Sequence, residues 1–193
     1  NVNFFCHTPP PPDAKREAVW RTGLAPFFKE FGIDGDSIAP GPGRSPFSAE
    51  VADVLEEFKP PVVSFHFGLP SSALMGRVRS WGGKILSSAT TVEEALWLEA
   101  HGANAVIAQG LEAGGHRGMF LTTDVTTQVS TLSLVPQVVA AIRLPVIAAG
   151  GIASAEGVRA ALALGASGVQ VGTAYLCSDE ALTSAVHRQA LQS

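Results

Sequence analysis

Two pairs of small residues at the ends of apolar runs could bind a phosphate group. Gly150 and Gly151 follow the expected strand at residues 145–149, and Gly172 and Thr173 follow the next expected strand at residues 169–171. Glycine lets several backbone N–H groups converge on an anion, and the N-terminus of a following helix adds its dipole. Alternatively, each pair only permits a tight turn between a strand and a helix. Because the pattern occurs twice in succession, we predict a phosphate site.

Two histidines have the position of groups that exchange protons with a bound molecule. His66 ends an apolar run within the sequence V-V-S-F-H-F-G-L-P, and His116 follows two glycines in Q-G-L-E-A-G-G-H-R-G. Histidine changes its charge near neutral pH, so either side chain could act as an acid or a base. The structural alternatives are a core role for either histidine and, for His116, a ring that only braces its loop. Both residues remain candidates for catalysis.

Amide side chains stand at the ends of two expected strands, at Gln109 and Gln170. A polar side chain inside a protein is costly unless its hydrogen bonds are used, so these amides suit the edge of a heterocycle or a hydroxylated chain. Glu112 is expected to brace its loop rather than to do chemistry. The sequence has no H-x-x-H, C-x-x-C or carboxylate cluster with the spacing of metal ligands, so we predict no metal site.

The candidate residues belong to a repeating β-α pattern. The expected strands are residues 2–6, 62–65, 84–88, 105–109, 146–149 and 168–171. The expected helices are residues 13–31, 46–58, 72–81, 92–101, 133–142, 155–164 and 179–191, with an irregular stretch at residues 38–46. Six strands joined by crossover helices indicate an α/β fold with a parallel sheet. This sheet is either open and doubly wound or a (β/α)8 TIM-type barrel that is incomplete by two strands, and in both folds ligands bind at the carboxyl ends of the strands.

Local signals mark several helix ends. Asp13 is expected to cap the first helix and Gly32 to end it. Thr91 and Glu94 have the spacing of a capping box, in which each side chain accepts from the backbone of the other residue. These signals support the order of strands and helices given above.

Composition and charge exclude several classes of partner. The chain has 193 residues, of which 46% are hydrophobic, so it can bury a full core. No uninterrupted apolar stretch reaches the roughly 18 residues of a membrane-spanning helix. A formal net charge of −4 without a cluster of Lys and Arg offers nothing to nucleic acid. Cys6 and Cys177 are far apart, which favours reduced thiols and a cytoplasmic location. Because the chain begins at Asn1 without a Met, we expect it to be part of a longer protein.

Several long motifs, in order, resemble one family. The runs S-F-H-F-G-L-P, S-A-T-T-V-E-E-A, A-V-I-A-Q-G-L-E-A-G-G-H-R-G, P-V-I-A-A-G-G-I and G-V-Q-V-G-T-A-Y-L are similar to those of the flavin-dependent nitronate monooxygenases, formerly called 2-nitropropane dioxygenases. The resemblance covers essentially the whole chain. It implies a (β/α)8 barrel with an added small helical part that holds FMN non-covalently.

The resemblance also implies which residues meet the cofactor and the substrate. FMN is expected to contact Asn3, Gln109, Gly114, Gly150, Gly151, Gln170, Val171, Gly172 and Thr173, with the two small-residue pairs at its phosphate. His66 is the best match to the active-site histidine of the family, and His116 is the second. The first two strands of the family have no counterpart before Asn1, and its C-terminal stretch is absent. We therefore expect residues 1–193 to form a single FMN-binding domain, an incomplete barrel of about six βα units.

The family oxidises alkyl nitronates with O2 to carbonyl compounds and nitrite. The resemblance therefore predicts an FMN-dependent oxidoreductase whose partners are O2 and a small-molecule nitronate, or a nitroalkane, with no nucleic-acid or membrane partner. One alternative is a flavin-dependent NAD(P)H reductase of the enoyl-ACP reductase type, because those barrels share the G-G-H loop, although the H-F-G-L-P run favours the monooxygenase. The other alternative is a barrel that binds flavin or phosphate without catalysis.

Overall fold

The described residues group into two compact units. The computed structural model describes residues 1–38, 41 and 43–192. One unit contains residues 1–7 and the described residues from Phe47 onward, and the other contains the described residues between Thr8 and Pro46. Of the predicted irregular stretch, Ala39, Pro40 and Pro42 lie outside the described residues. The assignment of residues 1–193 to one FMN-binding domain stays a prediction.

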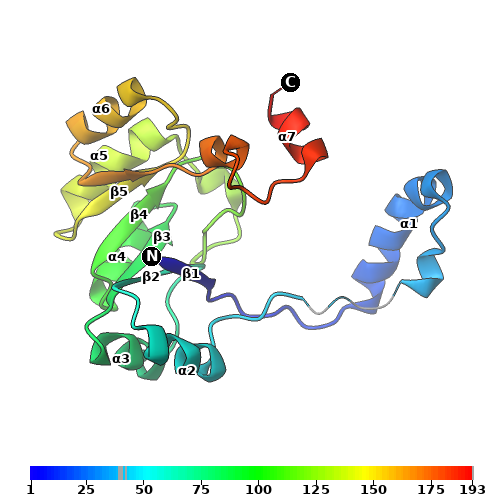
Figure 1. The fold of residues 1–193 in the computed structure, drawn as a ribbon, viewed down its shortest axis with the longest axis horizontal. Coiled ribbons are helices and arrows are strands. Elements are labelled where there is room, and N and C mark those ends of the chain that lie inside the picture. The colour runs from blue at the N-terminus through cyan, green and yellow to red at the C-terminus, as the bar shows by residue number, and fades with distance from the viewer. Residues whose placement is uncertain (39–40, 42, 193) are drawn as a thin grey trace. The chain divides into compact units, whose positions relative to one another are not determined.

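The larger unit is built on a parallel sheet (Figure 1). Its strands are β1 (Val2–Phe5), β2 (Val62–His66), β3 (Lys84–Ala89), β4 (Ala105–Gln109), β5 (Val146–Ala149) and β6 (Gly168–Gln170). They pair in sequence order, and all five pairs are parallel, as predicted. A doubly wound sheet reverses its strand order at a switch point, and this sheet has no reversal. Within the described residues β1 and β6 do not pair, so the fold is an incomplete barrel.

Helices follow the strands of this unit. They are α2 (Ala49–Phe58), α3 (Ser72–Ser80), α4 (Val92–Ala100), α5 (Thr131–Ala141), α6 (Ala155–Ala163) and α7 (Ala185–Leu191), with the short 3₁₀ helices η2 (Val125–Thr127) and η3 (Thr173–Cys177). Two helices begin elsewhere than predicted because a serine caps them. The hydroxyl of Ser48 accepts from the N–H of Val51 at the start of α2, and that of Ser130 accepts from the N–H of Ser133 at the start of α5.

The predicted helix at residues 179–191 is wrong in its first half. Ser184 caps α7 by accepting a hydrogen bond from the N–H of His187, so the helix begins at Ala185. The guanidinium of Arg188 donates to the carbonyl oxygens of Cys177, Ser178 and Ala181, at 2.8, 2.9 and 3.2 Å. These bonds hold the preceding segment as a turn.

The core consists of two clusters of buried apolar side chains between the strands and the helices. In one, Val106 of β4 packs with Leu134 and Val138 of α5, and none of the three is more than 1% exposed. In the other, Phe65 of β2 packs near Val78 of α3, and both are fully buried. Burying such a side chain stabilises a fold by about 1.5–3 kcal/mol. The apolar runs therefore fix the sheet whose strand ends carry the candidate residues.

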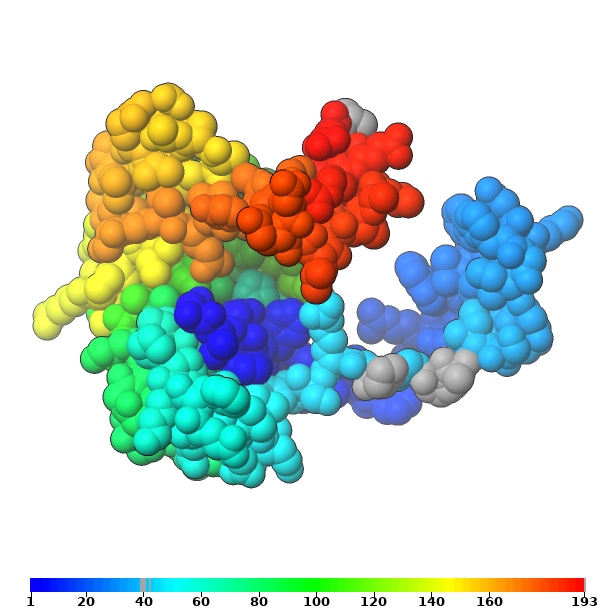
Figure 2. Space-filling model, in the orientation of Figure 1, coloured from blue at the N-terminus to red at the C-terminus, as the bar shows by residue number. Residues whose placement is uncertain are grey.

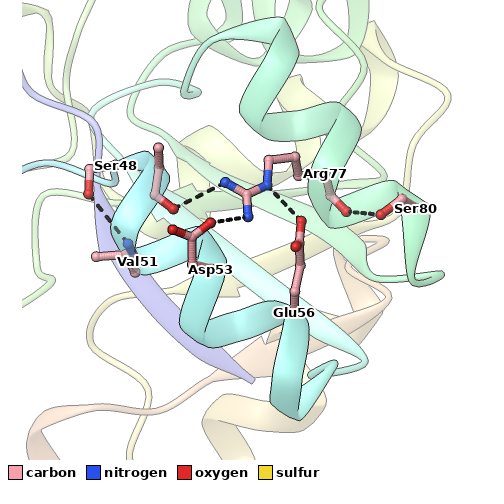
Figure 3. A network of polar contacts seen from close by, with 7 residues as sticks. Ser48, Val51, Asp53, Glu56, Arg77 and Ser80 are labelled. Atoms are coloured by element: carbon pink, nitrogen blue, oxygen red, sulfur yellow. Dashed lines mark hydrogen bonds and ion pairs between the residues drawn. The ribbon is translucent and has the colours of Figure 1, made fainter.

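Helices α2 and α3 are joined by a polar network around Arg77 (Figure 3). Its guanidinium donates to carboxylate oxygens of Asp53 and Glu56, both at 2.6 Å, and to the carbonyl of Ala49 at 3.1 Å. The hydrogen bond from Arg77 lowers the pKa of Glu56. These groups lie partly in solvent, where ion pairs contribute little, so the network sets the orientation of the two helices more than their stability.

The smaller unit is formed by the long helix α1 (Ala14–Phe31) and the 3₁₀ helix η1 (Gly35–Ser37). As predicted, the carboxylate of Asp13 caps α1, here by accepting from two backbone N–H groups, and Gly32 ends the helix with a left-handed φ of 62°. No residue of α1 is buried. None of the helices in the described part of the chain is long and apolar enough to cross a membrane.

Candidate active site

Two adjoining cavities lie at the carboxyl ends of the strands. Their volumes are about 360 and 460 Å³, and they share the lining residues Gln109, Gly114, Ala149, Gln170 and Gly172. All eleven predicted site residues line one or both of them: Asn3, His66, Gln109, Gly114, His116, Gly150, Gly151, Gln170, Val171, Gly172 and Thr173. In Figure 2 the first residues of the chain, in dark blue, lie beside the orange segment that follows β6, as the shared lining requires.

The smaller cavity has the character of an anion site. Gly151, Gly172 and Thr173 line it, and in the described part of the chain their backbone N–H groups donate to no other residue. Gly150 and Gly151 have backbone φ values of 120° and 67°, which residues other than glycine rarely adopt. Neither Lys nor Arg is among the described lining residues, so the backbone supplies the donors. Such N–H groups can bind a phosphate without a cationic side chain.

His66 is held at both ring nitrogens. Its Nε2 lies 3.0 Å from the carbonyl oxygen of His116, and its Nδ1 lies 3.0 Å from the hydroxyl oxygen of Ser88. A carbonyl oxygen can only accept, so Nε2 carries a hydrogen. Burial lowers the pKa of His66, and the hydrogen bond to the carbonyl of His116 opposes this effect only in part. The ring is therefore neutral at pH 7, and Nδ1 accepts from Ser88.

The side chain of Gln109 is also committed to the loop that follows β4. Its Nε2 donates to the carbonyl of His116 at 2.9 Å, and its Oε1 accepts from the N–H of Gly118 at 2.7 Å. A Cβ at Gly118 would lie 2.7 Å from Cε1 of His66, so only glycine fits there. Sequence reasoning missed Gly118, although it closes the G-G-H-R-G run. The amide of Gln109 thus braces its own loop as well as lining both cavities.

The ring of His116 is exposed at the larger cavity. It makes edge contacts with Phe5 and Phe67, with ring centroids 5.1 and 6.0 Å away, and its nitrogens have no hydrogen-bond partner among the described residues. Phe67 has a φ of 68°, a left-handed value that is costly for a residue with a side chain. The ring nitrogens of His116 are therefore open to a bound molecule, whereas those of His66 already have hydrogen-bond partners within the protein.

Two carboxylates brace the loop after β4. As predicted, Glu112 has a bracing role: its carboxylate accepts from the N–H and the hydroxyl of Thr131, at 2.8 and 2.9 Å. Burial raises the pKa of Glu112, but hydrogen bonds from its own N–H and from Thr131, together with the charge of Arg117, leave that pKa lowered. The second carboxylate, Glu94, is fully buried.

Glu94 does not complete the predicted capping box. Its backbone N–H donates to the hydroxyl of Thr91 at 3.2 Å, but its carboxylate turns to Thr90, whose N–H and hydroxyl donate to it at 2.7 and 2.8 Å. The other carboxylate oxygen accepts from the N–H groups of Phe120 and Leu121, at 2.6 and 3.1 Å. The capping box is therefore half correct, because the tertiary partners of Glu94 replace the local one.

The side-chain amides of Asn3 and Gln170, the other two predicted site amides, differ in their hydrogen bonds within the protein. Oδ1 of Asn3 accepts from the hydroxyl of Ser64 at 2.9 Å. Gln170 ends the edge strand β6 with its side chain exposed, and no other described residue makes a hydrogen bond to that side chain. Gln170 therefore keeps its full capacity for a ligand. Sequence reasoning missed Ser64 and Ser88, which line the larger cavity but lie inside apolar strands.

Comparisons with known proteins show relatives over the whole length of the chain. Residues 1–193 match the family described as nitronate monooxygenase. The nitronate monooxygenases of Pseudomonas aeruginosa and Paraburkholderia phytofirmans are 44% and 41% identical to the chain over 100% and 99% of its length. The matched parts are 55% and 52% of those proteins, so the chain spans about half their length.

Two solved structures are also similar to the chain. The nitroalkane oxidase from Streptomyces ansochromogenes has a TM-score of 0.87 and 38% identity, over 100% of this chain and 55% of that protein. The structure of FabK from Thermotoga maritima has a TM-score of 0.63 and 37% identity, over 75% of this chain and 43% of that protein.

Proposed function

Because the chain belongs to the nitronate monooxygenase family, we propose that it oxidises alkyl nitronates, and nitroalkanes, with O2 to carbonyl compounds and nitrite, and that its cofactor is FMN. The observation that carries this proposal is the convergence of all eleven predicted residues on two adjoining cavities. Sequence positions up to 170 residues apart, from Asn3 to Thr173, meet there. The family assignment favours nitronate oxidation over NAD(P)H-dependent flavin reduction.

The residues present fit FMN. The open N–H groups of Gly151, Gly172 and Thr173 would bind its phosphate, and Asn3 and Gln170 would offer amide hydrogen bonds to the rest of the molecule. When bound, FMN would supply the redox chemistry, the transfer of electrons from the substrate to O2. The protein would contribute position and proton transfer.

We assign the contact with the substrate to His116 and the support of its loop to His66. The sequence resemblance ranks His66 first, but both ring nitrogens of His66 are used within the protein. A neutral ring of His116 would accept the proton from the carbon of a nitroalkane, and a protonated ring would hold the nitro oxygens of a nitronate. A nitronate arrives as an anion and needs no base.

The partners and the location of the protein complete the proposed function. We propose that O2 and a small-molecule substrate are the partners, that nucleic acid and membrane are not, and that the protein works in the cytoplasm. Both cysteines are free in the structure, and burial raises the pKa of the Cys6 thiol to about 12. Such a thiol is inert, which agrees with a reducing compartment.

The proposal is tested by asking which reductant bleaches the flavin. The FMN-loaded protein is mixed without O2 with either propyl-2-nitronate or NADH and NADPH, and the absorbance of oxidised flavin is followed. We expect the nitronate to bleach it and the nicotinamides not to. Rapid bleaching by NADH or NADPH alone would favour the reductase. A protein that binds no flavin would argue against both enzymes.

A further inference from the structure

Ser88 connects the sheet to the candidate active-site loop through His66. Ser88 is the fifth residue of β3 and is 5% exposed, and its hydroxyl lies at the edge of the larger cavity. Its hydrogen-bond partner in the described part of the chain is Nδ1 of His66 at 3.0 Å. The opposite nitrogen of that ring meets the carbonyl of His116 at 3.0 Å. One imidazole thus bridges a buried strand and an exposed loop.

The direction of both hydrogen bonds follows from their chemistry. Nε2 of His66 must donate, because the carbonyl of His116 can only accept. In the neutral ring Nδ1 then has a lone pair, and the hydroxyl of Ser88 donates to it. Burial disfavours the charged ring, in which Nδ1 would donate instead. A ring held at two opposite points cannot rotate about its Cβ–Cγ bond.

The bridge reaches the ring of His116 through its carbonyl. That oxygen accepts hydrogen bonds from His66 of β2 and Gln109 of β4, at 3.0 and 2.9 Å. Side chains of two strands therefore fix the orientation of the peptide group after His116. Gly118 packs against the His66 ring closely enough that a Cβ would lie 2.7 Å from Cε1. Rotation of the His66 ring would therefore disturb both ends of the short segment that carries His116.

We propose that Ser88 is a positioning residue that locks the His66 ring in place and thereby holds the ring of His116 over the larger cavity. The role of His116 in this inference rests on the proposed function, whereas the bond between Ser88 and His66 does not. The neighbouring Ser87 provides a matched control. It is fully buried on the same strand, but its hydroxyl donates to backbone carbonyls of Phe65 and Gly68 and does not line the cavities.

The first measurement uses no substrate and no flavin. Nitrogen-15 spectra of the histidine rings are recorded for the wild type, Ser88→Ala and Ser87→Ala. We expect the Nδ1 resonance of His66 to move toward that of an imidazole nitrogen without a hydrogen bond, and its Nε2 hydrogen to exchange faster with water, in Ser88→Ala only. An unchanged His66 spectrum in Ser88→Ala would overturn the proposal. If Ser88→Ala does not fold, Ser88→Cys takes its place, because a thiol has nearly the same size and donates weakly.

The second measurement uses the FMN-loaded protein with a nitroalkane and its nitronate. We expect Ser88→Ala to lower kcat for the nitroalkane by roughly 2- to 10-fold, the effect of one lost neutral hydrogen bond, with KM changed by less than about twofold. Turnover of the nitronate should fall less, and Ser88→Thr should restore the nitroalkane rate. If Ser87→Ala lowers the nitroalkane rate as much as Ser88→Ala does, or if Ser88→Ala lowers the rates on both substrates equally, Ser88 has only a structural role. A wild type that oxidises neither substrate would defeat the proposed function, while the ring spectra would still decide the bond between Ser88 and His66.

Discussion

Nε2 of His66 lies 3.0 Å from the carbonyl oxygen of His116, although the two residues are 50 positions apart in the chain. The bond uses the side chain of one histidine and the backbone of the other. The ring of His116 is exposed at the larger cavity, whereas both ring nitrogens of His66 make hydrogen bonds within the protein. The roles that we propose for the two histidines therefore differ, and substitution can separate them.

Replacement of His116 by Asn should affect nitroalkanes more than nitronates. Proton transfer by a placed side chain contributes roughly 10²- to 10⁴-fold, and only the nitroalkane needs it. Steady-state rates on nitroethane and on its nitronate measure the ratio. His66→Asn is the comparison: because it only loosens the loop that carries His116, it should lower the nitroalkane rate relative to the nitronate rate by less than His116→Asn does. A larger nitroalkane-specific loss in His66→Asn would reverse the two assignments.

Gly172→Val should weaken FMN binding at the phosphate end. A Cβ at Gly172 would meet no protein atom within 4 Å, so the variant should fold normally, but its side chain would enter the space that backbone donors share with the phosphate. We expect at least a tenfold rise in the Kd for FMN, a loss of about 1.4 kcal/mol, measured by quenching of flavin fluorescence. Gly168→Val, at the other end of β6, also has an open Cβ position and serves as the control. Equal affinities of the two variants would remove Gly172 from the cofactor site.

Glu94→Gln should destabilise the fold more than a change of the neighbouring carboxylate. The carboxylate of Glu94 accepts four hydrogen bonds in a fully buried position, and an amide nitrogen cannot accept. We expect a loss of about 1.5–3 kcal/mol in the free energy of unfolding, measured in urea. Glu93→Gln, on the exposed side of the same first turn of α4, should cost less than about 1 kcal/mol. Similar midpoints for the two variants would show that the buried carboxylate is not an anchor.

The pKa of His66 predicts how its contribution to stability changes with pH. Burial lowers this pKa in the folded protein below the ordinary value of 6.5, so below that value the unfolded chain binds more protons than the folded one. Stability should therefore fall as pH drops below 6.5 toward the folded pKa, by at most about 1.4 kcal/mol per pH unit from this group. Urea denaturation of the wild type and of His66→Gln at several pH values measures this contribution as the difference between their free energies of unfolding. A difference that stays constant from pH 7 to 5 would contradict the lowered pKa.

The order of the strands and the position of the cavities could be predicted because they depend on local patterns. The apolar run before Gln109 and that before Gly150 indicated buried parallel strands, and parallel strands bring their carboxyl ends together. The glycine pairs lie at these strand ends and line a cavity there, and the phosphate site inferred from them stays a prediction. The sequence-order pairing of β1 to β6 then resolved the choice between a barrel and a doubly wound sheet.

The partners of individual polar side chains could not be predicted, since they depend on tertiary contacts. Glu94 has the local pattern of a capping box, but the backbone of Phe120 and Leu121 offers it stronger, buried hydrogen bonds. Gln109 was expected to meet a ligand, which stays a prediction, and the hydrogen bonds of its amide to the loop that carries His116 could not be foreseen. Ser88 gave no signal at all because one hydroxyl within a strand has no periodic pattern.

Nitrite formation from propyl-2-nitronate under air tests the central claim most directly. Nitrite and O2 uptake are followed together for the protein with FMN, the protein without FMN and the Gly172→Val variant at an FMN concentration that saturates only the wild type. The proposed function predicts that nitrite appears with O2 uptake in the first sample and that the other two are much slower. A protein that holds FMN, as its visible spectrum would show, and yet forms no nitrite from the nitronate would contradict it.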